Sequence, residues 1–293
     1  MIRVHKDFDN PPPGLATDAC NTQKRKALAE RAGHEFSSYH YRNSTIAALE
    51  EIYKRKCGYC ETPGSAGAAL RADHYRPKAR VKGVPGHEGY YWLGYEWSNL
   101  VLSCEKCNGR KLDQFPLEDE ATRVMQPVIG ADNLPLAGYC RADGHALRNE
   151  RPLLLNPELD SPDDHLAFLP NGSVMYKTPE GEKSIEVYHL KRDELVISRK
   201  KMTDTVLEKL KKHLLRYLSR EIDEDTYRYA MYDVYEEAAS SRQVDKPYSR
   251  VATALFEDFD GFIATHFPQH QQPYIRQTFD LYQQGRLWPR LNE

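Results

Sequence analysis

Two pairs of cysteines frame the part of the chain whose residue types could do chemistry. Cys57 and Cys60 form one Cys-x-x-Cys pair, and Cys104 and Cys107 form the other after a long insertion. Four thiolates complete the tetrahedral coordination of zinc and leave no open position for a substrate. A redox Cys-x-x-Cys usually lies beside a βαβ pattern, which this sequence lacks. The spacing therefore predicts a structural Zn²⁺ site.

Harder donor atoms lie inside this frame and directly after it. Asp73 and His74 are adjacent, Asn99 precedes a short apolar run, and Asn108 follows the last cysteine. The oxygens of Asp and Asn suit Mg²⁺ or Mn²⁺, whereas thiolates favour zinc. A neutral histidine near pH 7 can take a proton from water. The interleaved donors therefore predict a second, catalytic metal beside the structural one.

Positive charge is concentrated in the same stretch of chain. The sequence has a net charge of −2, but residues 54–111 hold eleven Lys and Arg against five Asp and Glu. Such a surplus beside metal ligands suits a phosphate backbone, although a solvated basic loop is the other explanation. Lys111 and Arg110 lie one turn into an expected helix and could contact a phosphate, or simply form a solvated helix face.

The elements that must position these residues are short. A strand is expected over residues 68–75, because Pro77 holds the preceding residue extended and helps to stop the strand just beyond His74. Residues 100–102 predict a second strand, and residues 107–114 a helix. Ser44 is expected to cap a helix that leads to the first cysteine pair. The predicted order is strand, long loop, strand, helix.

Five aromatic residues lie in the long loop, and we expect most of them to pack in the core instead of stacking on bases. They are Tyr90, Tyr91, Trp92, Tyr95 and Trp97.

Composition divides the chain into three regions. Residues 1–43 contain three consecutive prolines and few hydrophobic residues, which predicts an N-terminal arm with limited structure. Residues 44–150 hold the metal motifs. Residues 151–293 begin with a predicted β-hairpin around Asn171-Gly172 and a further strand over 185–188, followed by amphipathic helices that could dock a partner. The expected fold class is α+β.

No run of 18 apolar residues occurs, and the first residues lack the apolar core of a signal peptide. We therefore expect a cytoplasmic protein with no membrane segment. In a reducing compartment, paired cysteines favour metal over disulfides. Cys20 and Cys140 have no obvious partners and are expected to be free thiols.

The central motifs resemble those of the HNH, or ββα-metal, endonucleases. In that family an Asp-His pair ends the first strand, an Asn lies in the connecting loop, and an Asn or His opens the helix. Asp73-His74, Asn99 and Asn108 match these positions. The resemblance implies that His74 is the general base, that Asp73 and Asn108 are metal ligands, and that Asn99 orients the loop. It also implies a zinc-clamped ββα-metal core, since flanking cysteine pairs are frequent in zinc-bearing members.

A longer set of motifs is similar to one bacterial group of this family, the HNH subunit of Septu-type and retron-associated antiphage systems. These motifs are Asp-His-Tyr-Arg-Pro-Lys at 73–78, Trp-Ser-Asn-Leu at 97–100, Leu-Leu-Asn-Pro at 154–157 and His-Leu-x-Phe at 165–168. The resemblance implies an effector nuclease that works beside an ABC-type ATPase. The substrate would be DNA, which the family most often cuts, or tRNA or another RNA. The alternative is a non-catalytic, zinc-stabilised subunit that binds nucleic acid or a partner.

Overall fold

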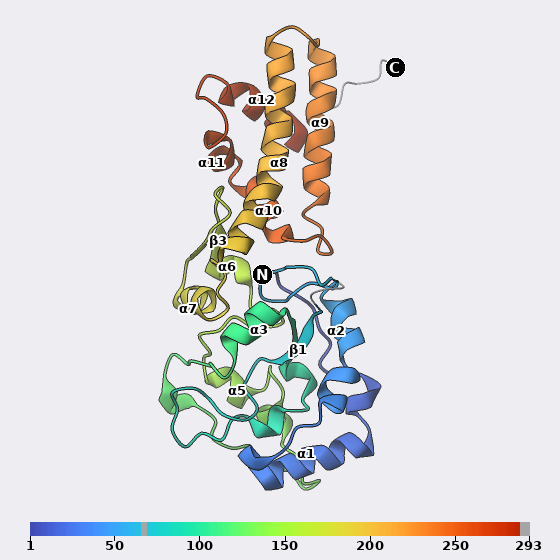
Figure 1. Ribbon diagram of the computed structural model, residues 1–293, viewed down its shortest axis with the longest axis vertical. Helices are drawn as coiled ribbons and strands as arrows, with labels where there is room; N and C mark the ends of the chain where they lie inside the picture. Colours follow the sequence, from blue (N-terminus) through green and yellow to red (C-terminus); the bar gives the residue numbers. More distant parts are fainter. Residues whose placement is uncertain (66–68, 288–293) are drawn as a thin grey trace. The chain divides into compact units, whose positions relative to one another are not determined.

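The computed structural model describes residues 1–65 and 69–287, and these form two compact units (Figure 1). Unit 1 comprises Met1–Leu166 and Tyr176–Leu190, and unit 2 comprises Ala167–Met175 and the described residues from Lys191 onward. Among the described residues, no helix combines the length and the apolar character that crossing a membrane requires. The functional division at residues 43 and 150 stays a prediction.

The centre of unit 1 is a two-stranded antiparallel sheet followed by a helix. Strand β1 (Arg71–His74) pairs with β2 (Leu100–Ser103), so that His74 lies opposite Leu100. Helix α3 (Glu105–Lys111) follows β2 directly and ends where Leu112 takes a positive φ of 47°. The predicted order of strand, loop, strand and helix is confirmed. The predicted start of the first strand at Ala68 lies outside the described residues.

The loop between β1 and β2 buries its aromatic residues. It contains two short 3-10 helices, η4 (Tyr91–Leu93) and η5 (Trp97–Asn99). The prediction that the aromatic run packs in the core is confirmed, since Tyr90, Tyr91, Trp92, Tyr95 and Trp97 are all buried.

The N-terminal segment is more ordered than its composition predicts. Helix α1 (Asp18–Glu30) is capped by Thr17, whose hydroxyl accepts a hydrogen bond from the Cys20 amide, and it buries Cys20 and Ala27. The expectation of limited structure in residues 1–43 was therefore wrong. A few scattered apolar residues and a buried Lys6 hold this segment in place, and such isolated residues give no periodic pattern in the sequence.

The approach to the first cysteine pair also differs from the prediction. Helix α2 (Ile46–Ile52) begins after Thr45, and a π-helical turn, η3 (Tyr39–Asn43), precedes it. Ser44 does not cap α2, because its hydroxyl donates to the His40 carbonyl within this π-helical turn. Single π-helical turns are rare and often lie at functional sites.

Unit 1 also contains the α-helices α4 (Ala137–Cys140), α5 (His145–Asn149), α6 (Pro162–His165) and α7 (Pro179–Val187), and the short 3-10 helices η1 (Pro13–Leu15), η2 (Arg31–Gly33) and η6 (Glu120–Thr122). Helix α7 occupies the place of the strand predicted at residues 185–188, so that prediction was wrong. The Thr178 hydroxyl accepts from the Gly181 amide, and Pro179 fixes a helical φ in the first turn. These start signals outweigh the β-branched residues near the end of the segment.

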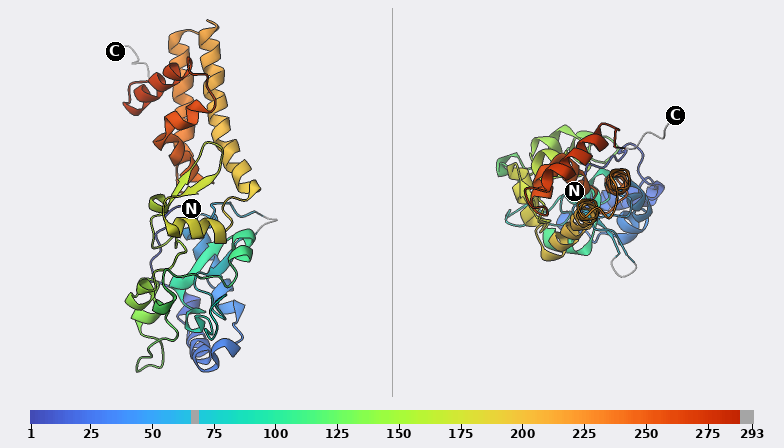
Figure 2. Two further views of the ribbon diagram at one scale, coloured as in Figure 1. Left: turned by 90° about the vertical axis from the view of Figure 1, so that its left-hand side faces the viewer. Right: turned by 90° about the horizontal axis from the view of Figure 1, so that it is seen from above.

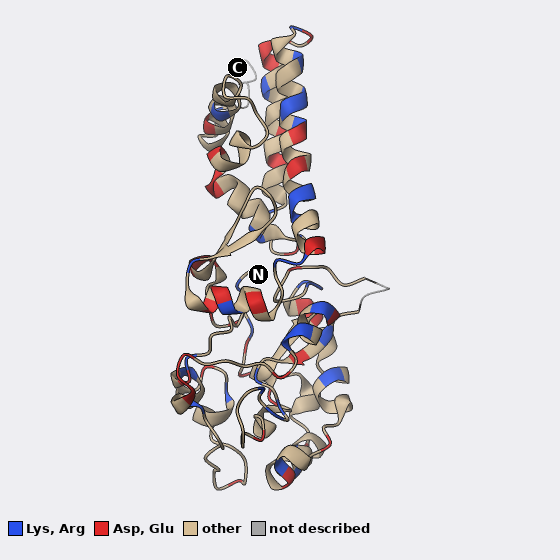
Figure 3. Ribbon diagram, turned by 60° about the vertical axis from the view of Figure 1, so that its left-hand side comes forward, with Lys and Arg blue, Asp and Glu red and all other residues tan. Residues whose placement is uncertain are grey.

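Unit 2 is mostly helical, as predicted. Strands β3 (Leu166–Phe168) and β4 (Val174–Tyr176) pair, which confirms the predicted hairpin, and Gly172 supplies a φ of 81° in its turn. The long helices α8 (Asp193–Leu218) and α9 (Glu224–Ser240) lie side by side (Figure 2). The shorter helices are α10 (Ser249–Glu257), α11 (Phe259–Ala264) and α12 (Gln272–Gln283). Acidic and basic residues are mixed along the long helices (Figure 3).

Candidate active site and zinc site

The four frame cysteines converge on one point in unit 1. The Sγ atoms of Cys57, Cys60, Cys104 and Cys107 all lie within 4.8 Å of one another, and those of Cys60 and Cys104 are 3.7 Å apart. A tetrahedral zinc site with Zn–S bonds of about 2.3 Å has sulfur–sulfur edges of about 3.8 Å. The donor set and its spacing therefore fit zinc.

The backbone ties this cluster to the sheet. The Gly58 amide donates to the Leu102 carbonyl of β2 at 2.8 Å, and a Cβ at Gly58 would lie 2.6 Å from the Tyr53 ring. Only glycine therefore fits between the first cysteine pair and this ring. Since Cys104 immediately precedes α3, a zinc ion would join the first cysteine pair to β2 and to α3.

A cavity of about 440 Å³ opens at the end of β1. Asp73, His74 and Asn108 line it together, so β1 and α3 bring three of the four predicted catalytic residues to one place. The other lining residues include several cations and one tyrosine: Tyr41, Arg42, Arg71, Lys78 and Arg80.

One ring nitrogen of His74 already has a hydrogen-bond partner. Its Nε2 lies 2.9 Å from the Gly94 carbonyl oxygen, and because that oxygen can only accept, Nε2 carries the proton and Nδ1 keeps a lone pair. The side chain is almost buried, with 8% of its surface exposed. Burial, with help from the Lys78 and Lys111 charges, holds the pKa of His74 well below its ordinary value. The ring is therefore neutral at pH 7.

Within the described part of the chain, Asp73 has partners on one carboxylate oxygen and none on the other. The Tyr59 hydroxyl donates to Oδ2 at 2.8 Å, and the Lys111 ammonium lies 3.5 Å from the same oxygen. Burial raises the pKa of Asp73, while the Lys111 charge and the Tyr59 hydroxyl act in the opposite direction. Oδ1 is left for a cation, and the half-buried Asn108 adds a second hard oxygen to the same cavity.

The two basic residues predicted to contact phosphate are in different surroundings. Lys111 has no exposed surface and donates to the His74 carbonyl oxygen at 2.6 Å. It supports the Asp73-His74 pair from inside the protein, so it does not present its ammonium to a substrate. Arg110 is exposed on α3 but is not among the residues that line the cavity. For Arg110, a phosphate contact stays a prediction.

The cavity also contains functional groups that the sequence reading missed. The Lys78 ammonium lies 4.1 Å from the centre of the Tyr41 ring, and that ring lies 4.8 Å from the His74 ring. Burial lowers the pKa of Lys78 to about 8, against the attraction of Asp73. Lys78 belongs to the Asp-His-Tyr-Arg-Pro-Lys motif and could have been found there. Tyr41 and Arg42 come from the π-helical turn, which no motif marks.

Asn99 does not line the cavity, and it supports the residues that do. Its Oδ1 accepts from the Arg76 amide at 2.8 Å, and its Nδ2 donates to the carbonyls of Arg76 at 3.0 Å and Leu93 at 3.2 Å. Its side chain thereby joins the end of β1 to the loop residue just before Gly94. This geometry supports an orienting role and leaves no free oxygen for a metal.

Comparison with known proteins supports the class that the sequence motifs resemble, the HNH endonucleases. The family model for HNH endonuclease matches residues 57–114. Septu protein PtuB of Bacillus mycoides (strain KBAB4) is 34% identical over 233 residues, which are 72% of each chain. Septu protein PtuB of Bacillus thuringiensis is 25% identical over 57% of this chain and 49% of its own length. No solved structure matches significantly.

A short antiparallel pair of strands, a helix, and an Asp-His pair beside a four-cysteine cluster define an HNH-type nuclease. The chain belongs to the HNH endonuclease family, in the group of Septu protein PtuB. It is also 28% identical to Septu protein PtuA of Bacillus mycoides (strain KBAB4), over 68% of this chain but only 24% of that protein.

Proposed function

We propose that the chain is a metal-dependent endonuclease that hydrolyses phosphodiester bonds through His74, Asp73 and Asn108, with Asn99 as the orienting residue. The observation that carries this proposal is the shared cavity. In it lie a neutral histidine with a free Nδ1, a carboxylate with a free Oδ1 and a second oxygen donor. A general base needs the first feature, and a hard divalent cation needs the other two.

In the proposed reaction, His74 Nδ1 takes a proton from the water that attacks the phosphorus. The new P–O bond forms as the bond to the 3′ oxygen breaks, and the leaving oxygen is protonated by solvent. The Gly94 carbonyl accepts from Nε2 throughout and stabilises the imidazolium while it is charged. Asp73 and Asn108 would hold Mg²⁺ or Mn²⁺, which supplies positive charge for the phosphate oxygens.

The cations at the cavity would bind the substrate backbone. Lys78, Arg42, Arg71 and Arg80 all line it, and charge-assisted bonds to phosphate are the contacts that position a nucleic acid without reading its sequence. We propose DNA as the favoured substrate and tRNA or another RNA as the second candidate. Both polymers carry the phosphate that this lining would bind.

We further propose a cytoplasmic effector subunit of an antiphage defence complex, with an ABC-type ATPase as its partner and unit 2 as the docking region. The named relatives are Septu proteins, and one of them, PtuA, contains a stretch similar to this chain within a protein several times as long. That similarity supports a module that works beside, or within, a larger assembly.

The test compares cleavage of plasmid DNA and total tRNA by the wild type and by His74→Ala, with Mg²⁺ or Mn²⁺. The partner is co-expressed in one arm. Loss of a positioned base typically lowers a rate by about 10²–10⁴-fold, so we expect cutting by the wild type alone. Equal activity in both proteins would exclude His74 as the base. No cutting in any arm, with nucleic acid still bound, would favour the non-catalytic alternative.

A further inference from the structure

The turn that carries Asn99 is held by two buried ion pairs, and each pair has a member outside residues 57–114. The first joins Arg76 to Glu150. The second joins Lys6 to Glu158, two residues that are 152 positions apart in the sequence. Neither pair touches the cavity, and neither has a role in the reaction described above.

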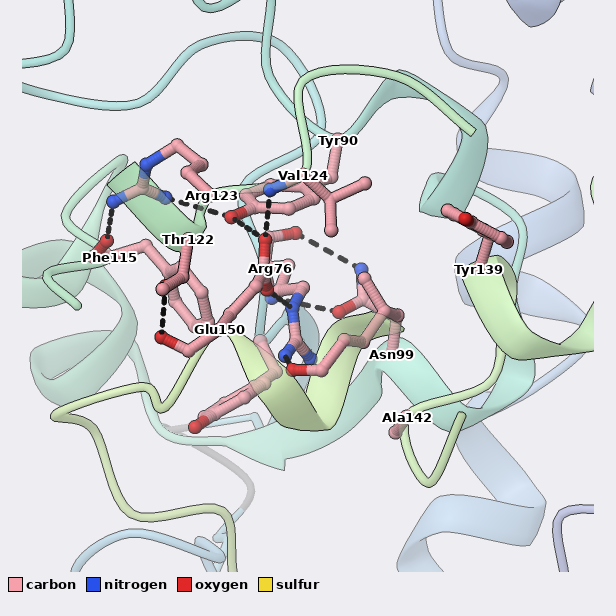
Figure 4. A network of polar contacts seen from close by, with 12 residues as sticks. Arg76, Tyr90, Asn99, Phe115, Thr122, Arg123, Val124, Tyr139, Ala142 and Glu150 are labelled. Atoms are coloured by element: carbon pink, nitrogen blue, oxygen red, sulfur yellow. Dashed lines mark hydrogen bonds and ion pairs between the residues drawn. The ribbon is translucent and has the colours of Figure 1, made fainter. Parts of the chain in front are cut away.

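Arg76 and Glu150 form the first support (Figure 4). Arg76 Nε donates to Glu150 Oε2 at 2.8 Å, and Arg76 Nη2 donates to the Leu147 carbonyl at 2.7 Å. Glu150 is itself fixed, because its Oε1 accepts from the Tyr90 hydroxyl at 2.8 Å and the Val124 amide at 2.9 Å. The Arg76 side chain is therefore held in one place. The backbone amide of Arg76 donates to Asn99 Oδ1, and the Arg76 carbonyl accepts from Asn99 Nδ2.

Lys6 forms the second support. Its ammonium donates to the carbonyls of Trp97 at 2.7 Å and Leu100 at 2.6 Å, which lie on either side of Asn99. Glu158 Oε1 accepts from the same ammonium at 3.1 Å and from the Tyr53 hydroxyl. The side chains of Lys6 and Glu158 have no exposed surface. A cation from the N-terminal segment thus clamps the backbone of the Asn99 turn.

Both supports lead to His74 by a short series of bonds. Asn99 Nδ2 donates to the Leu93 carbonyl, and the next carbonyl, that of Gly94, accepts from His74 Nε2. The Asn99 carbonyl also accepts from the Tyr75 amide, directly after His74. A shift of the Asn99 turn would therefore move the acceptor that orients the general base.

Buried ion pairs are a costly way to fill a core, and apolar residues of similar volume often stabilise a protein as well or better. What an ion pair adds is direction, since each bond fixes an angle as well as a distance. We propose that Glu150 and Lys6 are positioning residues that act on His74 through Asn99. This inference rests on the proposed nuclease function.

The test is a set of double-mutant cycles on nuclease activity. Glu150→Gln and Lys6→Met are each measured alone and combined with Asn99→Ala, with kcat, KM and zinc content for every protein. Outer residues that orient catalytic groups are typically worth about 10–100-fold. We expect kcat to fall by about that factor in each single variant, with KM and zinc content unchanged. If the residues act through Asn99, each double variant will be as slow as Asn99→Ala alone.

Glu120→Gln is the control. Glu120 is half exposed and pairs with Arg123 in the same network, and the substitution removes the same charge. The bonds from Arg123 reach Asn99 through Tyr90 and then through Glu150 itself. We expect its kcat to equal that of the wild type. A wild-type kcat in Glu150→Gln, or effects that add to that of Asn99→Ala, would overturn the inference and leave the nuclease assignment standing. An inactive wild type in every arm would count against the proposed function itself.

Hydrogen exchange gives a readout that needs no catalysis. The amides of Tyr75 and Arg76 are both bonded to Asn99, at 2.8 Å each. They should exchange faster in Glu150→Gln and in Lys6→Met, and at the wild-type rate in Glu120→Gln. Unchanged exchange of both amides in the first two variants would overturn the inference even if the protein is silent without its partner.

Discussion

At the scale of single residues, the proposed roles around the cavity follow from which atoms already have partners. His74 uses Nε2 on the Gly94 carbonyl, and Asp73 uses Oδ2 on Tyr59 and Lys111. The atoms left for chemistry are therefore His74 Nδ1 and Asp73 Oδ1. The sequence motif names these two residues, but only the bonds around them select the atoms.

Lys111 and Arg110 are neighbours on α3, but Lys111 is buried and Arg110 is exposed, so we expect different effects from substituting them. Removing one member of a buried ion pair typically costs about 3–5 kcal/mol, because the other charge is left without compensation. Lys111→Met should lower the free energy of unfolding by about this amount and strongly reduce cleavage. Arg110→Ala should change neither stability nor kcat, whatever its effect on KM. Thermal melting and cleavage rates of both variants check this, and a stable Lys111→Met protein with full activity would contradict it.

Lys78 gives the cavity a dependence on alkaline pH. Its pKa is lowered to about 8, so its positive charge is present below that pH and is lost as the pH rises through it. If Lys78 binds a substrate phosphate, kcat/KM should fall above about pH 8, because this ratio reports groups of the free enzyme. Lys78→Arg keeps its charge over the whole range and should move the fall to higher pH. Identical pH profiles of kcat/KM for the two proteins would exclude Lys78 as the titrating group.

At the scale of elements, the sequence predicted those parts whose signals are local. The strands β1 and β2, the helix α3 and the β3–β4 hairpin each have a proline, cysteine pair or Asn-Gly turn within a few residues. Residues 185–188 lie at the end of α7 and not in the expected strand, because Thr178 and Pro179 start this helix earlier in the sequence. The prediction of limited structure in residues 1–43 was wrong because partners distant in the sequence order this segment.

The zinc cluster ties two of these elements to the first cysteine pair, and it makes a prediction at this scale. Cys107→Ser removes one of four ligands and should lose zinc and unfold the region around α3, since structural zinc contributes directly to folding. Cys140→Ser is the control, because that thiol lies outside the cluster. Metal content and melting temperature decide the matter. Equal zinc and equal melting in wild type and Cys107→Ser would show that the cluster does not hold the fold.

At the scale of the whole molecule, the site depends on contacts that no single-sequence pattern reveals. Lys6 and Glu158 meet across 152 positions, and Arg76 and Glu150 across 74. Taken alone in the sequence, each of these four residues would be expected to be an ordinary surface charge. The motif residues that line the cavity could be named from the sequence because their spacing carries the signal. The supports were not, because an ion pair between distant segments has neither period nor spacing.

Unit 2 carries the prediction about the proposed partner. Leu215 and Leu218 lie one turn apart near the end of α8 and are 45% and 40% exposed, and Leu215 also lines a groove with Lys211 and Lys212. Exposed apolar residues with charged neighbours are typical of an interface core and its rim.

If the ATPase docks on this face, Leu215→Glu combined with Leu218→Glu should abolish co-purification with it. Val128→Glu is the matched control, because Val128 is equally exposed, at 45%, but belongs to unit 1. It should leave the complex intact. Both proteins should keep the zinc content of the wild type, which shows that unit 1 is folded. An interface core does not tolerate a buried carboxylate without a partner. Loss of the complex in Val128→Glu but not in the double variant would therefore place the docking surface on unit 1.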